Sequence, residues 1–245
     1  MNRISKYQII LILLVSYNSL LSNSISISSP SLPQDTIRRY TSIPAHLKPK
    51  ESQTSVAVLF TQIPYDWIEN AVEVPLFQVN NKLGLPYGLS LESSFQTIVV
   101  SNQIRSGPHW NYQSGKLSFG AGLEGEFMFG KMKVAGFNNK TWGWSVYPCI
   151  QAGYTIRDIA ISLNGELEFI KSLKETSGNE EIVNSRNMFS GISLSLFIEQ
   201  PLWKNHLVIL GFVNNFQKVF FPAWPSFSTF DRRYYIPQFY FGLVL

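Results

Sequence analysis

Charged residues and cysteine are scarce in this 245-residue sequence, and both shortages narrow the class of protein. Only 15% of the residues are Asp, Glu, Lys or Arg, against roughly 25% in typical soluble domains. The 20 basic residues are scattered and the net charge is +4, so nucleic-acid binding has little support. Cys149 is the only cysteine, which excludes an intrachain disulfide, and from the sequence we expect no cysteine-based zinc site. For the same reason we expect no lipid-anchored cysteine near the N-terminus.

The short motifs that commonly mark catalytic or cofactor sites are also missing. The sequence has no glycine-rich phosphate loop, no GxSxG or HExxH motif and no EF-hand spacing. It contains only three histidines. We therefore expect neither a cofactor nor a metal ion.

The first 53 residues differ in character from the rest of the chain. Arg3 and Lys6 precede an apolar core at 9–15, which is too short for the ~20 residues of a spanning helix, so residues 1–23 are expected to be a cleaved signal peptide. Residues 24–53 are rich in Ser, Pro and charge, with no periodicity, and are expected to form a flexible periplasmic lead-in. Residues 54–245 then form the folded domain.

Alternation of apolar and polar residues dominates that domain. In the clearest segment, 116–129, Leu117, Phe119 and Leu123 alternate with small or acidic residues. A period of two predicts β-strands with two unlike faces. The expected strands are 55–62, 71–79, 85–99, 104–111, 116–129, 142–157, 159–171, 187–200, 206–220 and 234–245. The predicted fold is all-β, a transmembrane up-and-down antiparallel β-barrel of about 8–10 strands.

The connections between these segments alternate in length, as in bacterial barrels with short periplasmic turns and long external loops. The expected long connections are 130–141, 172–186 and 221–233, and the expected short ones are 112–115, 158 and 201–205. Asn164-Gly165 is a common hairpin pair, but a turn there would leave a strand too short to cross a bilayer. We therefore place both residues inside a strand, facing the lumen.

Two features favour a membrane barrel over a soluble, lipocalin-like barrel. The polar faces hold Ser, Gly, Asn, Gln and a few Glu, with almost no Lys, whereas a solvated surface carries more charges of both signs. Aromatic residues gather near strand ends, as in the interfacial girdles of membrane barrels. About ten strands leave only a narrow lumen, where we expect Cys149 to be a buried, inert thiol. The polar network expected in the lumen comprises Glu92, Arg105, Glu124, Glu126, Arg157, Glu166, Glu168 and Glu199.

The C-terminal segment 234–245, YYIPQFYFGLVL, resembles the terminal strand of bacterial outer-membrane β-barrel proteins. Phe239, Phe241 and Leu243 fit the alternating pattern, and Leu245 stands where a Phe is usual. The resemblance is to the class and to no narrower family. It implies residence in the outer membrane, contact with outer-membrane lipids and lipopolysaccharide, and recognition by the barrel-assembly machinery. The sequence does not indicate an oligomeric state.

The leading functional hypothesis is a non-enzymatic barrel with a structural, adhesive or small-solute role, acting through its external loops. Loop 221–233 carries a possible partner site for lipopolysaccharide at Phe227, Phe230, Arg232 and Arg233; the alternative is that this loop folds over the barrel mouth.

Two further hypotheses remain open. Ser106 and His109 resemble the Ser/His pair of outer-membrane lipid A deacylases, but their odd separation places them on opposite faces of a regular strand, so only a kink at Gly107-Pro108 would bring them together. The last hypothesis is a soluble periplasmic lipid-binding barrel, in which the apolar face would point inward.

Overall fold

The computed structural model describes residues 40–64, 73–134, 137–203, 206–222 and 232–245. The chain divides into two units, residues 1–38 and 39–245, and all described residues belong to the second. The predicted signal peptide at 1–23 and most of the predicted lead-in lie outside the described residues. No helix within the described ranges is long and apolar enough to cross a membrane.

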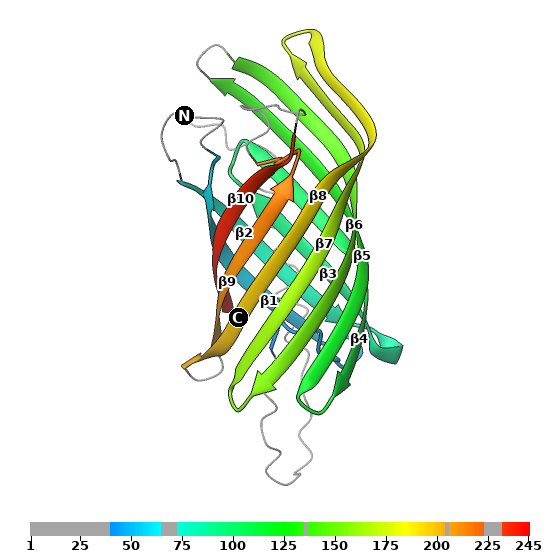
Figure 1. The fold of residues 1–245 in the computed structure, drawn as a ribbon, viewed down its shortest axis with the longest axis vertical. Coiled ribbons are helices and arrows are strands. Elements are labelled where there is room, and N and C mark those ends of the chain that lie inside the picture. Colours follow the sequence, from blue (N-terminus) through cyan, green and yellow to red (C-terminus); the bar gives the residue numbers. More distant parts are fainter. Residues whose placement is uncertain (1–39, 65–72, 135–136, 204–205, 223–231) are drawn as a thin grey trace, which may run out of the picture. The chain divides into compact units, whose positions relative to one another are not determined.

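The described residues form ten antiparallel strands that close into one barrel (Figure 1). Each strand pairs with its neighbours in the chain, and β1 pairs with β10 to complete the closure. The strands are β1 (Ser52–Gln62), β2 (Glu73–Gly84), β3 (Leu89–Thr97), β4 (Ser101–Ser114), β5 (Leu117–Val134), β6 (Phe137–Ile156), β7 (Ile159–Ser177), β8 (Glu180–Trp203), β9 (His206–Gln217) and β10 (Tyr234–Val244). A 3-10 turn, η1 (Pro86–Gly88), lies between β2 and β3. The predicted up-and-down barrel is confirmed, with ten strands.

Two of the predicted long loops are wrong, because strands β5 to β8 continue through them. Only residues 135–136 separate β5 from β6, and only 178–179 separate β7 from β8. Near Lys171 the register of β7 shifts relative to both β6 and β8. Side chains beyond this point face the opposite side of the barrel wall from the one that the earlier alternation predicts. The apolar and polar alternation in the sequence is therefore interrupted there. The paired hairpins extend past the other strands at one end of the barrel (Figure 1).

The strand pairing shows that two residue pairs expected to kink or turn the chain, Gly107-Pro108 and Asn164-Gly165, do not interrupt their strands. β4 runs unbroken through Gly107-Pro108, and the β4–β5 register is the same on both sides of this pair. β7 likewise runs through Asn164-Gly165, so the absence of a turn there is confirmed. Because neighbours on a strand alternate, only Asn164 lines the lumen, whereas a Cβ on Gly165 would meet Ile150 and Leu194 on the outer surface. The lumen placement of Gly165 was therefore wrong.

The two faces of the barrel wall differ in polarity. The outward face is apolar, and Ile150 and Leu194 keep exposed fractions of 69% and 53%. The inward face is polar, with Glu126 and Glu168 exposed by only 2% and 3%. This arrangement is that of a transmembrane barrel and the reverse of a soluble one.

Aromatic side chains form two bands on the outward face. One band includes Trp142, Trp144 and Phe129, near the long hairpins, and the other includes Trp110 and Tyr154, near the short turns. Trp144 and Tyr154 are about ten residues apart on β6, or about 33 Å along a strand at ~3.3 Å per residue. At a strand tilt of ~40° this becomes about 25 Å along the barrel axis, the height of the apolar band in outer-membrane barrels.

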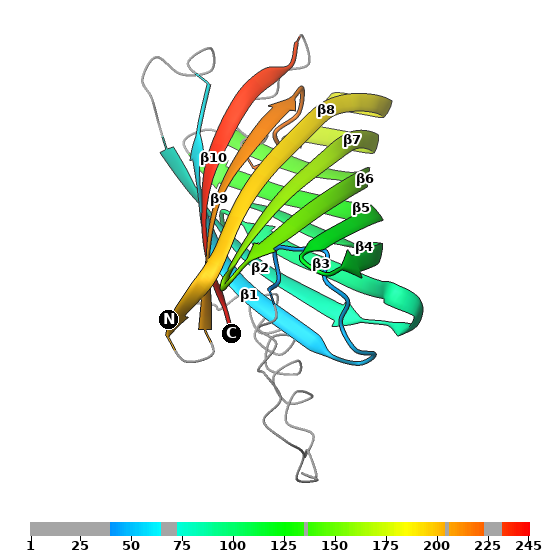
Figure 2. The same ribbon diagram turned by 60° about the horizontal axis from the view of Figure 1, so that its bottom comes forward.

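Residues 40–50, which we call the luminal segment, correct the prediction of a flexible lead-in over 24–53. Tyr40, Ile43 and Leu47 are buried at 5% exposure or less, and β1 already begins at Ser52. Tyr40 and Ile43 belong to the apolar cluster that includes Leu207 and Tyr240 inside the barrel. The dark blue segment before β1 lies at the end of the barrel that carries the short turns (Figure 2). The apolar side chains of the luminal segment are spaced so that they pack against the inner wall of the barrel. The Ser- and Pro-rich composition of the region does not reveal this packing.

Candidate functional site in the barrel lumen

Arg105 on β4 stands at the centre of the lumen. Its Nε donates to Glu124 Oε2 at 2.7 Å, and its Nη1 and Nη2 donate to Glu166 Oε2 at 3.1 Å. The guanidinium also lies 4.1 Å from the centroid of the Tyr147 ring. One cation on β4 therefore joins carboxylates on β5 and β7 across the barrel interior.

Toward the long hairpins, two more carboxylates meet the Tyr147 hydroxyl. Tyr147 Oη donates to Glu168 Oε1 at 2.8 Å and lies 3.3 Å from Glu126 Oε1. Gln103 Nε2 donates to the same oxygen of Glu126 at 3.4 Å. Hydrogen bonds among residues of β4, β5, β6 and β7 offset the free-energy cost of burying these polar groups.

Toward the short turns, the network joins the luminal segment. Lys82 Nζ lies 2.9 Å from Glu92 Oε1 and donates to the Ile43 carbonyl at 3.3 Å. Glu199 accepts the backbone N–H of Thr41 at 3.0 Å and that of Ser42 at 2.8 Å, together with both hydroxyls. Charged groups on β2 and β8 thus hold the luminal segment inside the barrel.

Seven of the eight residues expected in the polar network line the lumen, and Arg157 does not. Arg157 lies in the two-residue turn between β6 and β7, is exposed, and has a positive φ of 53°. The alternation that placed it on the lumen face ends one residue earlier, at Ile156. Sequence reasoning missed Lys82 and Tyr147 as members of the network, although the alternation along their strands places both residues on the lumen face.

Removing Glu199 is expected to release the luminal segment. Hydrogen bonds to a carboxylate contribute about 1.5–3 kcal/mol each, and Glu199→Ala would delete those that hold Thr41 and Ser42. Hydrogen–deuterium exchange of a peptide covering residues 40–47 should show protection reduced by at least about tenfold. Glu181→Ala, at the exposed hairpin tip, is the control and should leave exchange unchanged; unchanged exchange in Glu199→Ala would contradict the anchoring.

Ser106 and His109 do not come together. Ser106 is exposed on the outward face and its Oγ lies 2.8 Å from Ser93 Oγ, whereas His109 is buried in the lumen at 1% exposure. The regular β4 backbone through Gly107-Pro108 keeps the two side chains on opposite sides of the wall. This geometry gives no support to a Ser/His hydrolytic pair.

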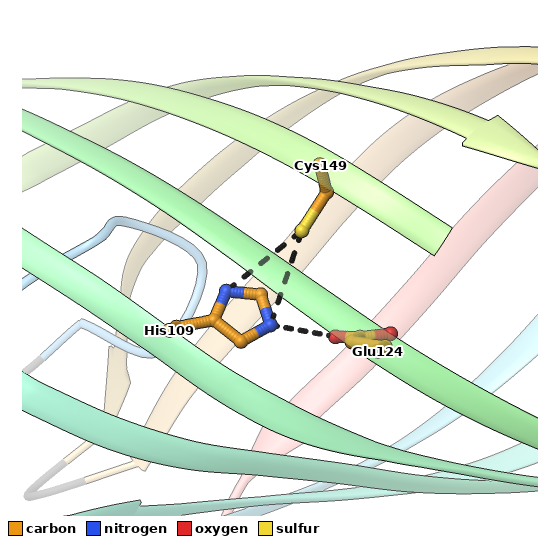
Figure 3. Close-up of side chains that lie close together, drawn as sticks. All are labelled: His109, Glu124 and Cys149. Carbon is orange, nitrogen blue, oxygen red and sulfur yellow. Dashed lines mark hydrogen bonds and ion pairs between the residues drawn. The ribbon is translucent and has the colours of Figure 1, made fainter. Parts of the chain in front are cut away.

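His109 instead meets Glu124 and Cys149 (Figure 3). His109 Nε2 lies 2.8 Å from Glu124 Oε1, and Cys149 Sγ lies 3.9 Å from Nε2 and 4.0 Å from Nδ1. The nearly equal distances show that no single ring nitrogen is directed at the thiol, so the arrangement is not that of a base activating a cysteine nucleophile. The predicted burial of Cys149 on the lumen side is confirmed, but its neighbours were not foreseen.

The cavities found between the described residues of the lumen are small. Two cavities of about 180 Å³ and 150 Å³ are present, and Arg105 and Glu166 line both. The first also touches the luminal segment, and the second is bordered by Phe220 and Phe221 at the other end. These volumes hold a few water molecules and are below the ~300 Å³ of a small-molecule pocket.

The partner site expected in loop 221–233 is only partly described. Phe227 and Phe230 lie outside the described residues. Arg233 Nε donates to the Ser190 carbonyl at 3.1 Å, and its guanidinium lies over the Phe189 ring. Arg232 is exposed and its guanidinium lies over Tyr234.

No family model matches the sequence, and a search of curated proteins finds no match. Among solved structures, Neisserial surface protein A is similar at 10% identity, covering 79% of this chain and 96% of that one, with a TM-score of 0.39. KdgM porin is similar at 12% identity, covering 78% and 97%, with a TM-score of 0.37. Ail, the attachment invasion locus protein of Yersinia pestis, is similar at 8% identity, covering 81% and 100%, with a TM-score of 0.29. At such identities and TM-scores the likeness carries no conclusion about function.

Proposed function

We propose that this protein is an integral outer-membrane barrel with a closed lumen, serving a structural or adhesive role at the cell surface. The observation that carries this proposal is the continuous apolar outward face between two aromatic bands about 25 Å apart. In water such a surface would be an aggregation hazard, whereas in a bilayer acyl chains solvate it. A closed barrel also satisfies every backbone group that the hydrocarbon cannot.

A role in solute passage is disfavoured by the filled lumen. Arg105 and its carboxylate partners cross the middle of the barrel, and the luminal segment fills the short-turn end. At the other end Val219 and Phe221 are buried against Met128 and Ile170. A soluble lipid carrier is disfavoured too, because its ligand cavity would need an apolar interior.

The long hairpins are the natural surface for a partner. Short turns face the periplasm in bacterial barrels, which directs the β5–β8 extension to the outside. β8 has 24 residues, more than twice the ~9–11 that cross a bilayer. The extension is therefore an ordered sheet beyond the membrane, in place of the long external loops expected from the sequence.

Basic side chains cluster on the outward face of this extension, just beyond the aromatic band. Lys131 and Lys133 follow Phe129 on β5, Lys140 precedes Trp142 on β6, and all three lysines are exposed. Lys131 and Lys140 are directly opposite each other in the β5–β6 register, an arrangement of like charges that is destabilising unless an anion lies between them. We call these three residues the basic row. It lies where the phosphates of lipopolysaccharide would be.

Neutralising the basic row is expected to weaken binding to purified lipopolysaccharide. A basic residue near an anionic membrane surface contributes about 1 kcal/mol, so Lys131→Gln, Lys133→Gln and Lys140→Gln combined should raise the dissociation constant roughly 100-fold at low salt. The matched control replaces Lys48, Lys50 and Lys116 by Gln, which removes the same charge at the opposite end of the barrel. An equal loss of affinity for lipopolysaccharide in both triple variants, or no loss in the first variant, would contradict the proposed partner surface.

Recognition by the barrel-assembly machinery belongs to the same proposal. β10 ends at Val244 and closes the barrel against β1, with Leu243 opposite Val56. Phe239 and Phe241 are exposed on the outward face, in agreement with the alternation expected of a terminal strand.

A further inference from the structure

His109, Gly122 and Cys149 lie in one row across three neighbouring strands. His109 pairs with Gly122 in the β4–β5 register, and Gly122 pairs with Cys149 in the β5–β6 register. A Cβ on residue 122 would lie 2.5 Å from His109 Nδ1 and Cε1. The glycine therefore leaves the space that the imidazole occupies between β4 and β6, next to the thiol.

Three different ligand atoms converge at this point. His109 Nε2, Glu124 Oε1 and Cys149 Sγ all lie within 4.8 Å of one another. Imidazole, carboxylate and thiolate are the three ligand types that bind zinc in proteins. We propose that these three side chains bind one divalent cation of the zinc class, which replaces the hydrogen bond between His109 Nε2 and Glu124 Oε1. The proposal goes beyond the surface role and does not depend on it.

The distances are close to those of a loaded site. Tetrahedral zinc, with bonds of about 2.0 Å to nitrogen and oxygen and about 2.3 Å to sulfur, separates nitrogen from oxygen by about 3.3 Å and nitrogen from sulfur by about 3.5 Å. The corresponding separations here are 2.8 Å and 3.9 Å. The ligand atoms of Glu124 and Cys149 lie within 4.8 Å of each other, so side-chain rotation that draws the thiol toward the other two ligands would form the site. The adjacent cavity, which Glu124 lines, can supply water as a fourth ligand.

The surrounding groups would orient the ligands. Glu92 Oε2 lies 3.8 Å from His109 Nδ1, the ring nitrogen that a metal-bound histidine usually directs to a carboxylate. Glu92 is held in turn by Lys82 at 2.9 Å. Arg105 Nε occupies Glu124 Oε2 at 2.7 Å, which leaves Oε1 for the metal.

Charge balance also agrees with a bound cation. Three carboxylates, Glu92, Glu124 and Glu166, face two cations, Lys82 and Arg105. With a protonated imidazole these groups sum to zero. A divalent cation that replaces the imidazolium proton and the Cys149 thiol proton leaves the sum at zero. Because Cys149 is the only cysteine and is buried, it has no disulfide partner within the chain, and metal binding gives the thiol a role.

Cobalt titration of the folded full-length protein tests this inference. Co²⁺ bound by a thiolate gives a sulfur-to-metal charge-transfer absorption, and we expect one equivalent to develop it, with Zn²⁺ displacing it. Cys149→Ser should lose the absorption, and His109→Gln should raise the dissociation constant at least about tenfold. Gly122→Ala keeps all three ligands but should lose the band as well, because the added Cβ displaces the imidazole.

His206→Gln is the matched control, since His206 is on β9, outside the cluster, and its Nδ1 donates to the Val244 carbonyl at 3.3 Å. Folding of each variant is checked by the change in gel mobility on boiling. Absence of the band in folded wild-type protein would overturn the proposal. So would a band that persists in folded Cys149→Ser, or zinc affinity that His109→Gln leaves unchanged.

Discussion

Replacing Arg105 with alanine is expected to lower the free energy of unfolding of the barrel by about 3–5 kcal/mol, the cost of removing one partner from a buried ion pair. The guanidinium is only 20% exposed and bonds both Glu124 and Glu166. Without it these carboxylates remain inside the lumen, near Glu126 and Glu168, with no cation between them. Their mutual repulsion and desolvation would then oppose the folded state.

Urea unfolding of protein folded in lipid vesicles, followed by tryptophan fluorescence, measures this loss. Arg157→Ala is the control, because it removes the same charge from an exposed turn and should change stability by less than about 0.5 kcal/mol. Equal stability of the Arg105→Ala variant and the wild type would show that Arg105 does not organise the lumen. Equal losses in the two variants would point to net charge as the cause.

Replacing Ile150 with lysine is expected to prevent or strongly weaken membrane insertion. Ile150 is 69% exposed on the outward face of β6, between Trp144 and Tyr154 and therefore near the bilayer midplane. A lysine at this depth costs about 2–4 kcal/mol in an outer-membrane barrel. In a water-soluble barrel the same change at an exposed isoleucine would be neutral or favourable, so the sign of the effect separates the two environments.

The matched control for this change is Ile182→Lys, the same substitution near the start of β8. Ile182 is 53% exposed in the β7–β8 extension beyond the aromatic band, where water and headgroups surround the sheet. The amount of folded protein in the outer-membrane fraction should fall at least about tenfold for Ile150→Lys and stay near wild type for Ile182→Lys. An amount near wild type for both variants would place Ile150 outside the hydrocarbon.

Strand alternation predicted the barrel because lipid and lumen impose opposite polarities on successive residues. The pattern around Leu117 to Phe129 shows this, and the same parity correctly placed Glu124, Glu126 and Cys149 inside. The sequence did not reveal the extended hairpins, since the irregular register near Lys171 interrupts the alternation and the exposed sheet beyond the membrane is polar on its outer face. A stretch with Lys131, Lys133 and Lys140 therefore has the composition of a loop.

The contents of the lumen depend on contacts between strands far apart in the sequence. Thr41 and Ser42 bond Glu199, across more than half of the chain, and no local pattern encodes that pairing. The meeting of His109 with Cys149 depends on the register of β4, β5 and β6 and on the space left by Gly122. The alternation alone predicted which side of the barrel wall each residue faces, but not its position along the barrel axis.

The claim on which the others depend is that the apolar outward face lies in a bilayer and encloses a closed barrel. The most direct measurement is electrophoresis of the detergent-extracted outer-membrane fraction on a denaturing gel, with and without boiling. We expect the protein in that fraction, with a mobility that changes on boiling, because closed barrels of this kind resist detergent at room temperature. Recovery in the soluble periplasmic fraction, with one mobility under both conditions, would contradict the membrane barrel.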